Sequence, residues 1–413
     1  MRAGGNAMPW KPICRGSLRQ QLFESVQDIA RGLRESEADL EDVSYSGGKS
    51  GVALFFAYLA SACGDAEAAA CSARLMEQAL ETAGESVRTV GFFGGLSGIG
   101  WSYRHIHQLL HGRPAAEDVT ADLDDLIAEL VAVGPWPWEY DLIYGLAGIG
   151  AYALDHPNRA WRESVIGKIL DRLEESAQRF DHGIAWLNRP ELMVEVDAER
   201  YPQGRFDMGL AHGTAGVVGF LGQICKAGGF GDRARAMLSD AIAWLLSSRR
   251  PEGGGSVFPV FFGELASCRS AWCYGDPGTA AALFRAGEGA RGSAWESAAL
   301  DIARRDCFRP FEDCGVVDAG LCHGSAGLAH LYARFFQATG ERVFLAAATR
   351  WLRETLAMRQ AGEGLGGYSS WWPLAGEWRT APGLLTGVAG IGLALIAATT
   401  SVEPGWDRPL LLS

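Results

Sequence analysis

The segment from 213 to 224, GTAGVVGFLGQI, joins the motif Gly-x-x-Gly to a run of small and apolar residues. The same pattern occurs seven times, each time after an apolar lead-in. The paired glycines stand at 48/51, 95/98, 145/148, 213/216, 275/278, 324/327 and 387/390. Successive first glycines are 47, 50, 68, 62, 49 and 63 residues apart, about the length of a two-helix repeat with insertions. The spacing predicts an all-helical solenoid or a closed ring.

Three consecutive copies carry reactive side chains directly before the first glycine. These pairs are Ala211-His212 in copy four, Cys273-Tyr274 in copy five and Cys322-His323 in copy six. In a ring of equivalent hairpins, equivalent positions face the same mouth. We therefore expect residues that are more than a hundred positions apart in the chain to meet in one place.

The composition is that of an ordinary globular protein, because 48% of the residues are hydrophobic and 21% are charged. A formal net charge of −12 and the lack of a long Lys/Arg run argue against nucleic-acid binding. The N-terminus has no continuous apolar segment of a secretory signal. The longest apolar stretch, 383–398, is too short for a membrane span and is interrupted by glycines. We predict a cytoplasmic protein without a transmembrane segment.

Two kinds of helix are expected. Each copy of the motif opens a segment that is apolar nearly all round, such as 52–59 and 217–224, which is typical of a helix enclosed on every side. Between the copies, amphipathic patterns predict half-exposed helices at 66–83, 121–133, 160–178, 232–248 and 341–358. The simplest architecture is an inner ring of buried helices within an outer ring, in one domain of residues 1–413.

Three long intervals between copies predict insertions. In the first, residues 183–187 and 192–196 alternate like short strands, and in the second, residues 256–262 have strand composition. We expect these insertions, at about 180–206 and 250–266, to form a small strand-containing extension. The third, 362–382, predicts a long loop whose aromatic side chains either line a peptide groove or cover an apolar end of the ring. Its aromatic residues are Tyr368, Trp371, Trp372 and Trp378.

Cys273, Cys322 and His323 together are a zinc-ligand set. Nine cysteines in a chain without an export signal favour free thiols and metal ligands over a disulfide framework. Two sulfurs and one imidazole suit tetrahedral Zn²⁺, and three protein ligands leave one position open, as in catalytic sites. Because a metal-bound thiol loses its proton, such a site is suited to activating a substrate thiol. The alternative is that two buried cysteines and a core histidine share a repeat register by coincidence.

Three segments resemble the signatures of the LanC family of lanthionine-forming cyclases: Gly209-Leu210-Ala211-His212-Gly213, Trp272-Cys273-Tyr274-Gly275 and Cys322-His323-Gly324. The resemblance extends over all seven copies of the motif. It implies an α/α toroid of seven helical hairpins with a central zinc ion. It also implies that a cysteine thiol of a dehydrated precursor peptide is added to a dehydroalanine or dehydrobutyrine of the same peptide, forming a lanthionine or methyllanthionine ring.

The resemblance also implies roles for individual residues. Cys273, Cys322 and His323 match the zinc ligands, and His212 matches a catalytic histidine that protonates the enolate formed by thiol addition. Asp141, four positions before Gly145, matches a residue that orients or charge-stabilises His212. Arg269 and Tyr274 match two further active-site positions; the arginine would pair with Asp141 or stabilise the enolate, and the tyrosine could simply be packed ring wall.

The short stretch of about 43 residues before the first copy favours a stand-alone cyclase over a fused synthetase. Its expected partners are the precursor peptide, a separate dehydratase and an exporter, and it would meet a membrane only through a complex with them. Two alternatives remain open. One is a LanC-like glutathione- or peptide-binding protein without cyclase activity. The other is a zinc-dependent protein prenyltransferase subunit, a family whose Asp/Cys/His ligand set fits this sequence less well.

Overall fold

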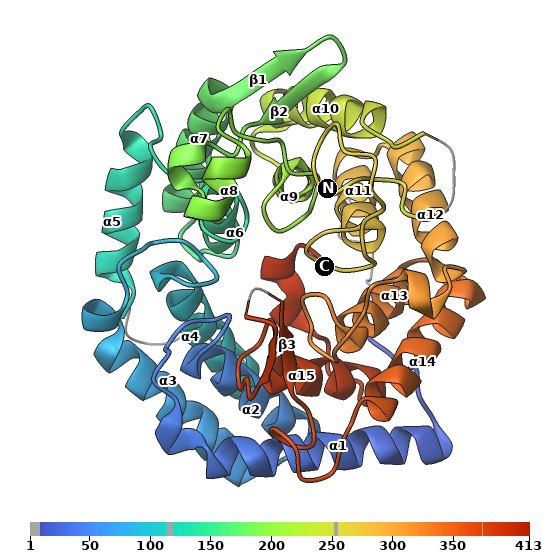
Figure 1. The fold of residues 1–413 in the computed structure, drawn as a ribbon. Coiled ribbons are helices and arrows are strands. Elements are labelled where there is room, and N and C mark those ends of the chain that lie inside the picture. Colours follow the sequence, from blue (N-terminus) through green and yellow to red (C-terminus); the bar gives the residue numbers. More distant parts are fainter. Residues whose placement is uncertain (1–8, 114–118, 252–254, 374) are drawn as a thin grey trace.

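The computed structural model describes residues 9–113, 119–251, 255–373 and 375–413, and they form two concentric rings of helices (Figure 1). The inner ring of the described residues contains α2 (Lys49–Cys63), α4 (Leu96–His111), α6 (Leu146–Leu154), α9 (Thr214–Ala227), α11 (Asp276–Ala290), α13 (Ser325–Thr339) and α15 (Val388–Thr399). The outer ring contains α1 (Gly16–Glu35), α3 (Ala66–Ser86), α5 (Ala121–Ala132), α7 (Arg159–Ser176), α10 (Gly231–Ser247), α12 (Ser293–Cys307) and α14 (Arg342–Ala357). The predicted all-α toroid of seven hairpins is confirmed.

The burial of the two rings follows the sequence pattern. Every residue of α2 from Ser50 to Ala60 is buried, whereas α3 buries one face and exposes the other. An inner helix has a neighbour on every side and therefore carries no polar face. The amphipathic helices predicted from the sequence agree with the observed outer helices to within three residues at each end.

Each inner helix starts directly after the first glycine of its motif. A Cβ atom on the second glycine of any copy would lie 1.8–2.3 Å from the carbonyl oxygen of the residue six positions earlier. The loop that precedes each helix, here called the entry loop, therefore folds back onto the helix start too closely for any side chain. Gly275 is further restricted to glycine by its φ of +130°.

Backbone hydrogen bonds join the seven entry loops into a closed circle. The residue two positions before the first glycine takes part in every copy. Around the circle these residues are Ser46, Phe93, Ile143, Ala211, Cys273, Cys322 and Leu385. The circle closes where the amide of Leu385 donates to the carbonyl of Ser46 at 2.9 Å, and α15 packs against α2. Equivalent positions of the repeat therefore do face one mouth.

The C-terminal segment enters the centre of the ring (Figure 1). It contains the 3-10 turn η4 (Gly405–Leu410), and Trp406 within it is fully buried. The carboxylate of Asp407 accepts hydrogen bonds from Arg334 at 2.6 and 2.8 Å and contacts Nε2 of His330 at 2.7 Å. This buried charge cluster ties the C-terminal segment to α13.

The first insertion is only partly strand. β1 (Ala177–Phe180) and β2 (Gly183–Trp186) form an antiparallel hairpin, so the strand predicted at 183–187 is confirmed. The strand predicted at 192–196 is wrong, because this segment ends the 3-10 turn η2 (Pro190–Leu192) and begins α8 (Glu195–Arg200). The acidic first turn of α8 favours a helix start, and Val194 and Val196 are exposed rather than packed on a sheet.

The strand predicted at 256–262 is also wrong. The amides of Val257 and Phe258 donate to the buried carboxylate of Asp276 at the start of α11, at 2.6 and 3.0 Å, and not to another strand. Phe261 forms one isolated bridge with Asp207 of the neighbouring entry loop. The two insertions meet, as expected, but through single contacts and not through a sheet: the amide of Phe262 donates to the carbonyl of Phe206 at 2.9 Å, and the hydroxyl of Tyr201 donates to Glu264 at 3.1 Å.

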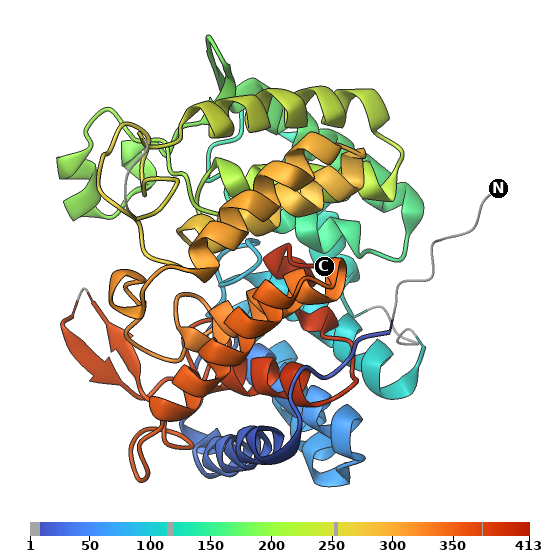
Figure 2. The same ribbon diagram turned by 90° about the vertical axis from the view of Figure 1, so that its right-hand side faces the viewer.

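The third insertion is a ribbon rather than a loop. β3 (Ser370–Trp372) and β4 (Glu377–Arg379) pair antiparallel, and Trp371 stands opposite Trp378 with ring centroids 5.5 Å apart. Such cross-strand aromatic pairs stabilise short ribbons. The ribbon (red) and α8 (green) project from the same end of the ring (Figure 2). Tyr368 is buried beneath, whereas Trp372 and Trp378 are exposed.

Two further 3-10 turns are η1 (Glu37–Asp39) and η3 (Phe311–Asp313). Within the described part of the chain, every helix is too short or too polar to cross a lipid bilayer.

Candidate active site

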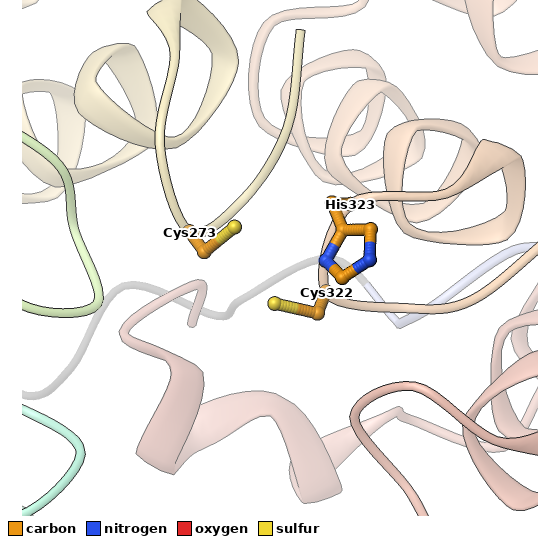
Figure 3. A group of neighbouring side chains, drawn as sticks. All are labelled: Cys273, Cys322 and His323. Atoms are coloured by element: carbon orange, nitrogen blue, oxygen red, sulfur yellow. The ribbon is translucent and has the colours of Figure 1, made fainter. Parts of the chain in front are cut away.

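The circle of entry loops brings Cys273 and Cys322 side by side. They occupy the same position in adjacent copies, and the amide of Cys273 donates to the carbonyl of Cys322 at 3.3 Å. His323 follows Cys322 directly. The ligand atoms of all three side chains lie within 4.8 Å of one another (Figure 3). The three residues proposed as metal ligands from the sequence therefore converge, and they could hold a metal ion.

The thiols of Cys273 and Cys322 and the imidazole of His323 are linked by hydrogen bonds that a bound cation could replace. The hydrogen bond from Cys322 lowers the pKa of the Cys273 thiol well below that of a free cysteine, and the same contact raises the pKa of Cys322. Burial opposes the charged form of His323, but the hydrogen bond and charge of Cys273 raise its pKa. A divalent metal would replace these protons and satisfy both sulfurs and the imidazole.

Arg269 lies on the metal-ligand side of the mouth. Its positive charge acts on both Cys273 and Cys322 and favours their thiolate forms. Among the described residues no ion pair joins Arg269 to Asp141, so the pairing considered from the sequence is wrong. The carboxylate of Asp141 is instead occupied by other partners.

His212 and Asp141 form a partly buried hydrogen-bonded pair across copies four and three. Oδ1 of Asp141 accepts from the amides of Tyr144 and Gly145 at 2.7 and 3.1 Å, which fixes the side chain and leaves Oδ2 to face His212. Nδ1 of His212 therefore donates to Oδ2 of Asp141, at 2.6 Å. Nε2 is left to exchange a proton at the mouth, where the side chain is 31% exposed. The predicted orientation of His212 by Asp141 is present.

The electrostatic environment keeps His212 protonated to a higher pH than that at which a free histidine loses its proton. Burial alone would lower its pKa, but the hydrogen bond to Asp141 and the negative charges of Asp141, Asp207 and Cys273 outweigh burial, so the pKa is raised. A histidine with this environment is suited to donating a proton near neutral pH.

Tyr274 is held beside His212 by a residue that sequence reasoning did not select. Its hydroxyl donates to Oδ2 of Asp207 at 2.5 Å, and its ring lies 6.1 Å from the imidazole of His212. Oδ1 of Asp207 accepts from Arg205 at 2.9 Å. A Cβ at Gly209 would lie 2.6 Å from the tyrosine ring, which explains that glycine in the motif around His212. Burial and the carboxylate of Asp207 raise the pKa of Tyr274 well above its usual range.

The repeat register contains a signal that could have revealed Asp207. It stands six positions before Gly213, just as Arg269 stands six before Gly275 and Asp318 six before Gly324. The carboxylate of Asp318 is also used, since it accepts from the amides of Gly320 and Trp371 at 3.0 Å each. The position six residues before the first glycine thus carries polar side chains in these three copies, and those of Asp207 and Asp318 hold neighbouring groups in place by hydrogen bonds.

A pocket of about 470 Å³ opens beside His212. One wall is the entry loop of copy three, with Trp136, Trp138 and Tyr144. The first insertion contributes further lining residues between Leu187 and Asp197, and His212 and Tyr274 also line the pocket. The insertion therefore builds a cavity next to the histidine.

Fold and site together define an α/α toroid with a Cys₂His cluster and a histidine–carboxylate pair at its mouth. The chain belongs to the family of lanthionine synthetase C-like proteins, whose family model matches residues 39–411. The family expected from the three motifs is thereby confirmed.

One curated relative is the nisin biosynthesis protein NisC of Lactococcus lactis subsp. lactis, which is 25% identical over 213 residues. That match covers 48% of this chain, and the chain spans about half the length of the relative, 50%. Among solved structures, the nisin cyclase superposes with a TM-score of 0.75 at 20% identity, covering 96% of this chain and 98% of the other. The shared fold is the helical toroid.

Proposed function

We propose that this protein is a zinc-dependent lanthionine synthetase, a cyclase that closes thioether rings in a precursor peptide. The reaction adds a cysteine thiol to a dehydroalanine or dehydrobutyrine of the same chain and yields lanthionine or methyllanthionine. The observation that carries the proposal is the convergence of Cys273, Cys322 and His323 beside the His212–Asp141 pair. Family membership supports it.

Zinc is the metal that this donor set favours, because two thiolates and one imidazole are typical zinc ligands and three ligands leave a place for substrate. When bound there, zinc would lower the pKa of the peptide thiol and leave its sulfur nucleophilic. Arg269, close enough to favour the thiolates of Cys273 and Cys322, adds positive charge to this side of the mouth.

His212 supplies the proton that completes the addition. The carbon–sulfur bond forms at the β-carbon of the dehydro residue, and the electron pair of the carbon–carbon double bond moves toward the carbonyl as an enolate. Nε2 of protonated His212 then delivers a proton to the α-carbon. Asp141 holds the imidazole in the required tautomer and stabilises its charged form. The proton released by the thiol restores His212 for the next ring.

Tyr274 is proposed as a positioning residue and not as an acid. Its hydroxyl proton is donated to Asp207, and its raised pKa keeps it protonated. The ring can therefore shield one side of His212 while Asp207 fixes its orientation. Arg269 is proposed to stabilise the anionic charge of the enolate.

We further infer that the protein acts in the cytoplasm, as one domain of residues 1–413, on a peptide that a separate dehydratase has prepared and an exporter later removes. The repeats of the ring supply every residue named above.

The experiment that tests the proposal combines metal content with ring formation. Mass spectrometry should find about one zinc per native chain and none in Cys273→Ala or Cys322→Ala, with Cys63→Ala, an exposed cysteine outside the cluster, as the matched control. Incubation with a synthetic peptide containing dehydroalanine and cysteine should remove the free thiol without a change in mass. Zinc that persists in both cluster variants would refute the metal site.

A peptide that binds but keeps its free thiol would favour the alternative of a peptide-binding protein without cyclase activity. The prenyltransferase alternative loses its support, because the chain belongs to the lanthionine synthetase C-like family.

A further inference from the structure

The pocket beside His212 carries a carboxylate without a cationic partner. Glu139 lines it and is half-buried, and in the part of the chain that the structure describes no ion pair or hydrogen bond is made by its side chain. Its backbone carbonyl, in contrast, accepts from Nε1 of Trp136 at 2.7 Å, which fixes the loop. Partial burial of an unpaired charge costs free energy, so the geometry leaves room for a cation supplied by a ligand.

The two arginines of the pocket do not fill this role, because each already has its own partners. Arg205 pairs with Asp207 at 2.9 Å and with Asp197 at 3.1 Å. Arg189 lies 3.6 Å from Glu191 and donates to the backbone carbonyl of Pro137 at 2.5 Å. The lining thus holds four carboxylates, Glu139, Asp141, Asp197 and Asp207, against two guanidinium groups and His212. The electrostatic balance favours a cation over an anion.

Aromatic rings next to Glu139 suit an alkylammonium or guanidinium group. Trp136 and Trp138 pack edge to face with centroids 4.9 Å apart, and Trp138 and Tyr144 are about half exposed toward the mouth. A cation over such rings gains cation–π attraction, and the methylene chain of lysine or arginine can lie along the apolar wall made by Leu187, Leu192 and Met193.

We propose that this pocket, here called the Glu139 pocket, binds a lysine or arginine side chain of the precursor peptide that flanks the dehydro residue. The proposal rests on the cyclase function proposed above, since His212 then marks where the α-carbon of the dehydro residue lies. The side chain of the peptide residue next to the dehydro residue then reaches the Glu139 pocket directly. The pocket therefore selects which dehydro residue is presented to His212.

Binding is tested without ring closure by using the full-length, zinc-loaded protein and the probe acetyl-X-dehydroalanyl-X-glycyl-serine amide. Serine replaces cysteine, so no thioether can form, and X is lysine or its uncharged isostere norleucine on both sides. Titration calorimetry should give about tenfold tighter binding for the lysine peptide, the sum of one cation–π contact and one ion pair. The preference should weaken as salt is raised.

Glu139→Gln should reduce the lysine preference to about two- to fivefold, the part that the cation–π contact retains, and leave norleucine binding unchanged. Glu191→Gln removes the same charge from an exposed residue nearby that does not line the pocket, and it should keep the preference. Equal binding of the two peptides, no binding of the lysine peptide, or a lysine preference that is undiminished in Glu139→Gln would each overturn the proposal.

The cysteine versions of both peptides separate this proposal from the proposed function. Lysine-selective binding without loss of the thiol would refute the cyclase while keeping the pocket as a binding site for a basic peptide. Thiol loss at equal rates from both peptides would keep the cyclase and refute the pocket.

Discussion

Replacing Asp141 by asparagine should reduce ring closure by lowering the pKa of His212. In the native protein the charged imidazole donates to a buried carboxylate at 2.6 Å. The amide oxygen of asparagine can still accept from the amides of Tyr144 and Gly145, so its NH₂ group must face Nδ1 of His212. The variant therefore favours the neutral imidazole with its proton on Nε2, and protonation of Nδ1 is opposed.

The size of the effect follows from the interaction that is lost. A hydrogen bond to a charged group contributes about 1.5–3 kcal/mol, which corresponds to about one to two pKa units. Because the native pKa is raised, protonated His212 persists as the pH rises and is lost only above that pKa. In the variant this loss occurs about one to two units lower. At pH 8 the rate should fall about ten- to a hundredfold, with a smaller deficit at pH 6.

The assay measures the free thiol of the dehydroalanine–cysteine peptide by alkylation and mass spectrometry at a series of pH values. Zinc content is the control, because neither oxygen of Asp141 contacts a metal ligand. An alkaline limb of kcat/KM that stays in place in Asp141→Asn, with zinc retained, would refute His212 as the proton donor.

Three further outcomes follow from single contacts. Tyr274→Phe should change the cyclisation rate by less than about threefold. It should lower the free energy of unfolding in urea by about 1–2 kcal/mol, because the buried carboxylate of Asp207 loses a hydrogen-bond donor. A hundredfold loss of rate would show that the hydroxyl takes part in the chemistry. Asp407→Asn should cost about 1.5–3 kcal/mol, because the buried guanidinium of Arg334 loses charged hydrogen-bond acceptors and keeps only its ion pair with Glu403 at 2.7 Å. Burial opposes the charge of Asp407, but Arg334 and His330 hold its pKa below the usual range. The stabilisation of the fold by this carboxylate is therefore present above about pH 4 and is lost as the pH falls. Thermal melts that show the same acid dependence in Asp407→Asn would contradict this. Gly327→Ala should lower the yield of folded, zinc-loaded protein, because the added Cβ would lie 1.8 Å from a backbone carbonyl oxygen. As the control, Gly84→Ala has open space around the added Cβ and should leave the free energy of unfolding unchanged or raise it.

The ring and the convergence of Cys273, Cys322 and His323 could be predicted from the sequence because both depend on repetition. Helix starts, buried inner helices and amphipathic outer helices are set by residues close together in the chain. Once the repeat is recognised, symmetry alone places Cys273 next to Cys322, since both stand two positions before a first glycine. No knowledge of side-chain packing is needed for that step.

Prediction failed where a segment's partners come from outside its own repeat. The apolar alternation at 192–196 and 256–262 favours strands. Among the described residues, however, 192–196 pairs with no strand, and 256–262 forms only the isolated bridge of Phe261 with Asp207. The amides of Val257 and Phe258 are satisfied instead by the carboxylate of Asp276. Strand formation depends on such long-range partners more than helix formation does.

The repeat in the sequence was enough to predict the seven-hairpin ring, the register of the mouth and the convergence of Cys273, Cys322 and His323. The His212–Asp141 pair was expected from the family resemblance, whereas the hydrogen bond from Tyr274 to Asp207 is evident only in the structure. The structure also shows the charge of Arg269 acting on the two thiols. In the part of the chain that the structure describes, the side chain of Glu139 has no partner. The physical reason is that repeat spacing fixes where a backbone position lies, whereas a hydrogen bond or an ion pair depends on distances of a few ångströms between side chains on different repeats.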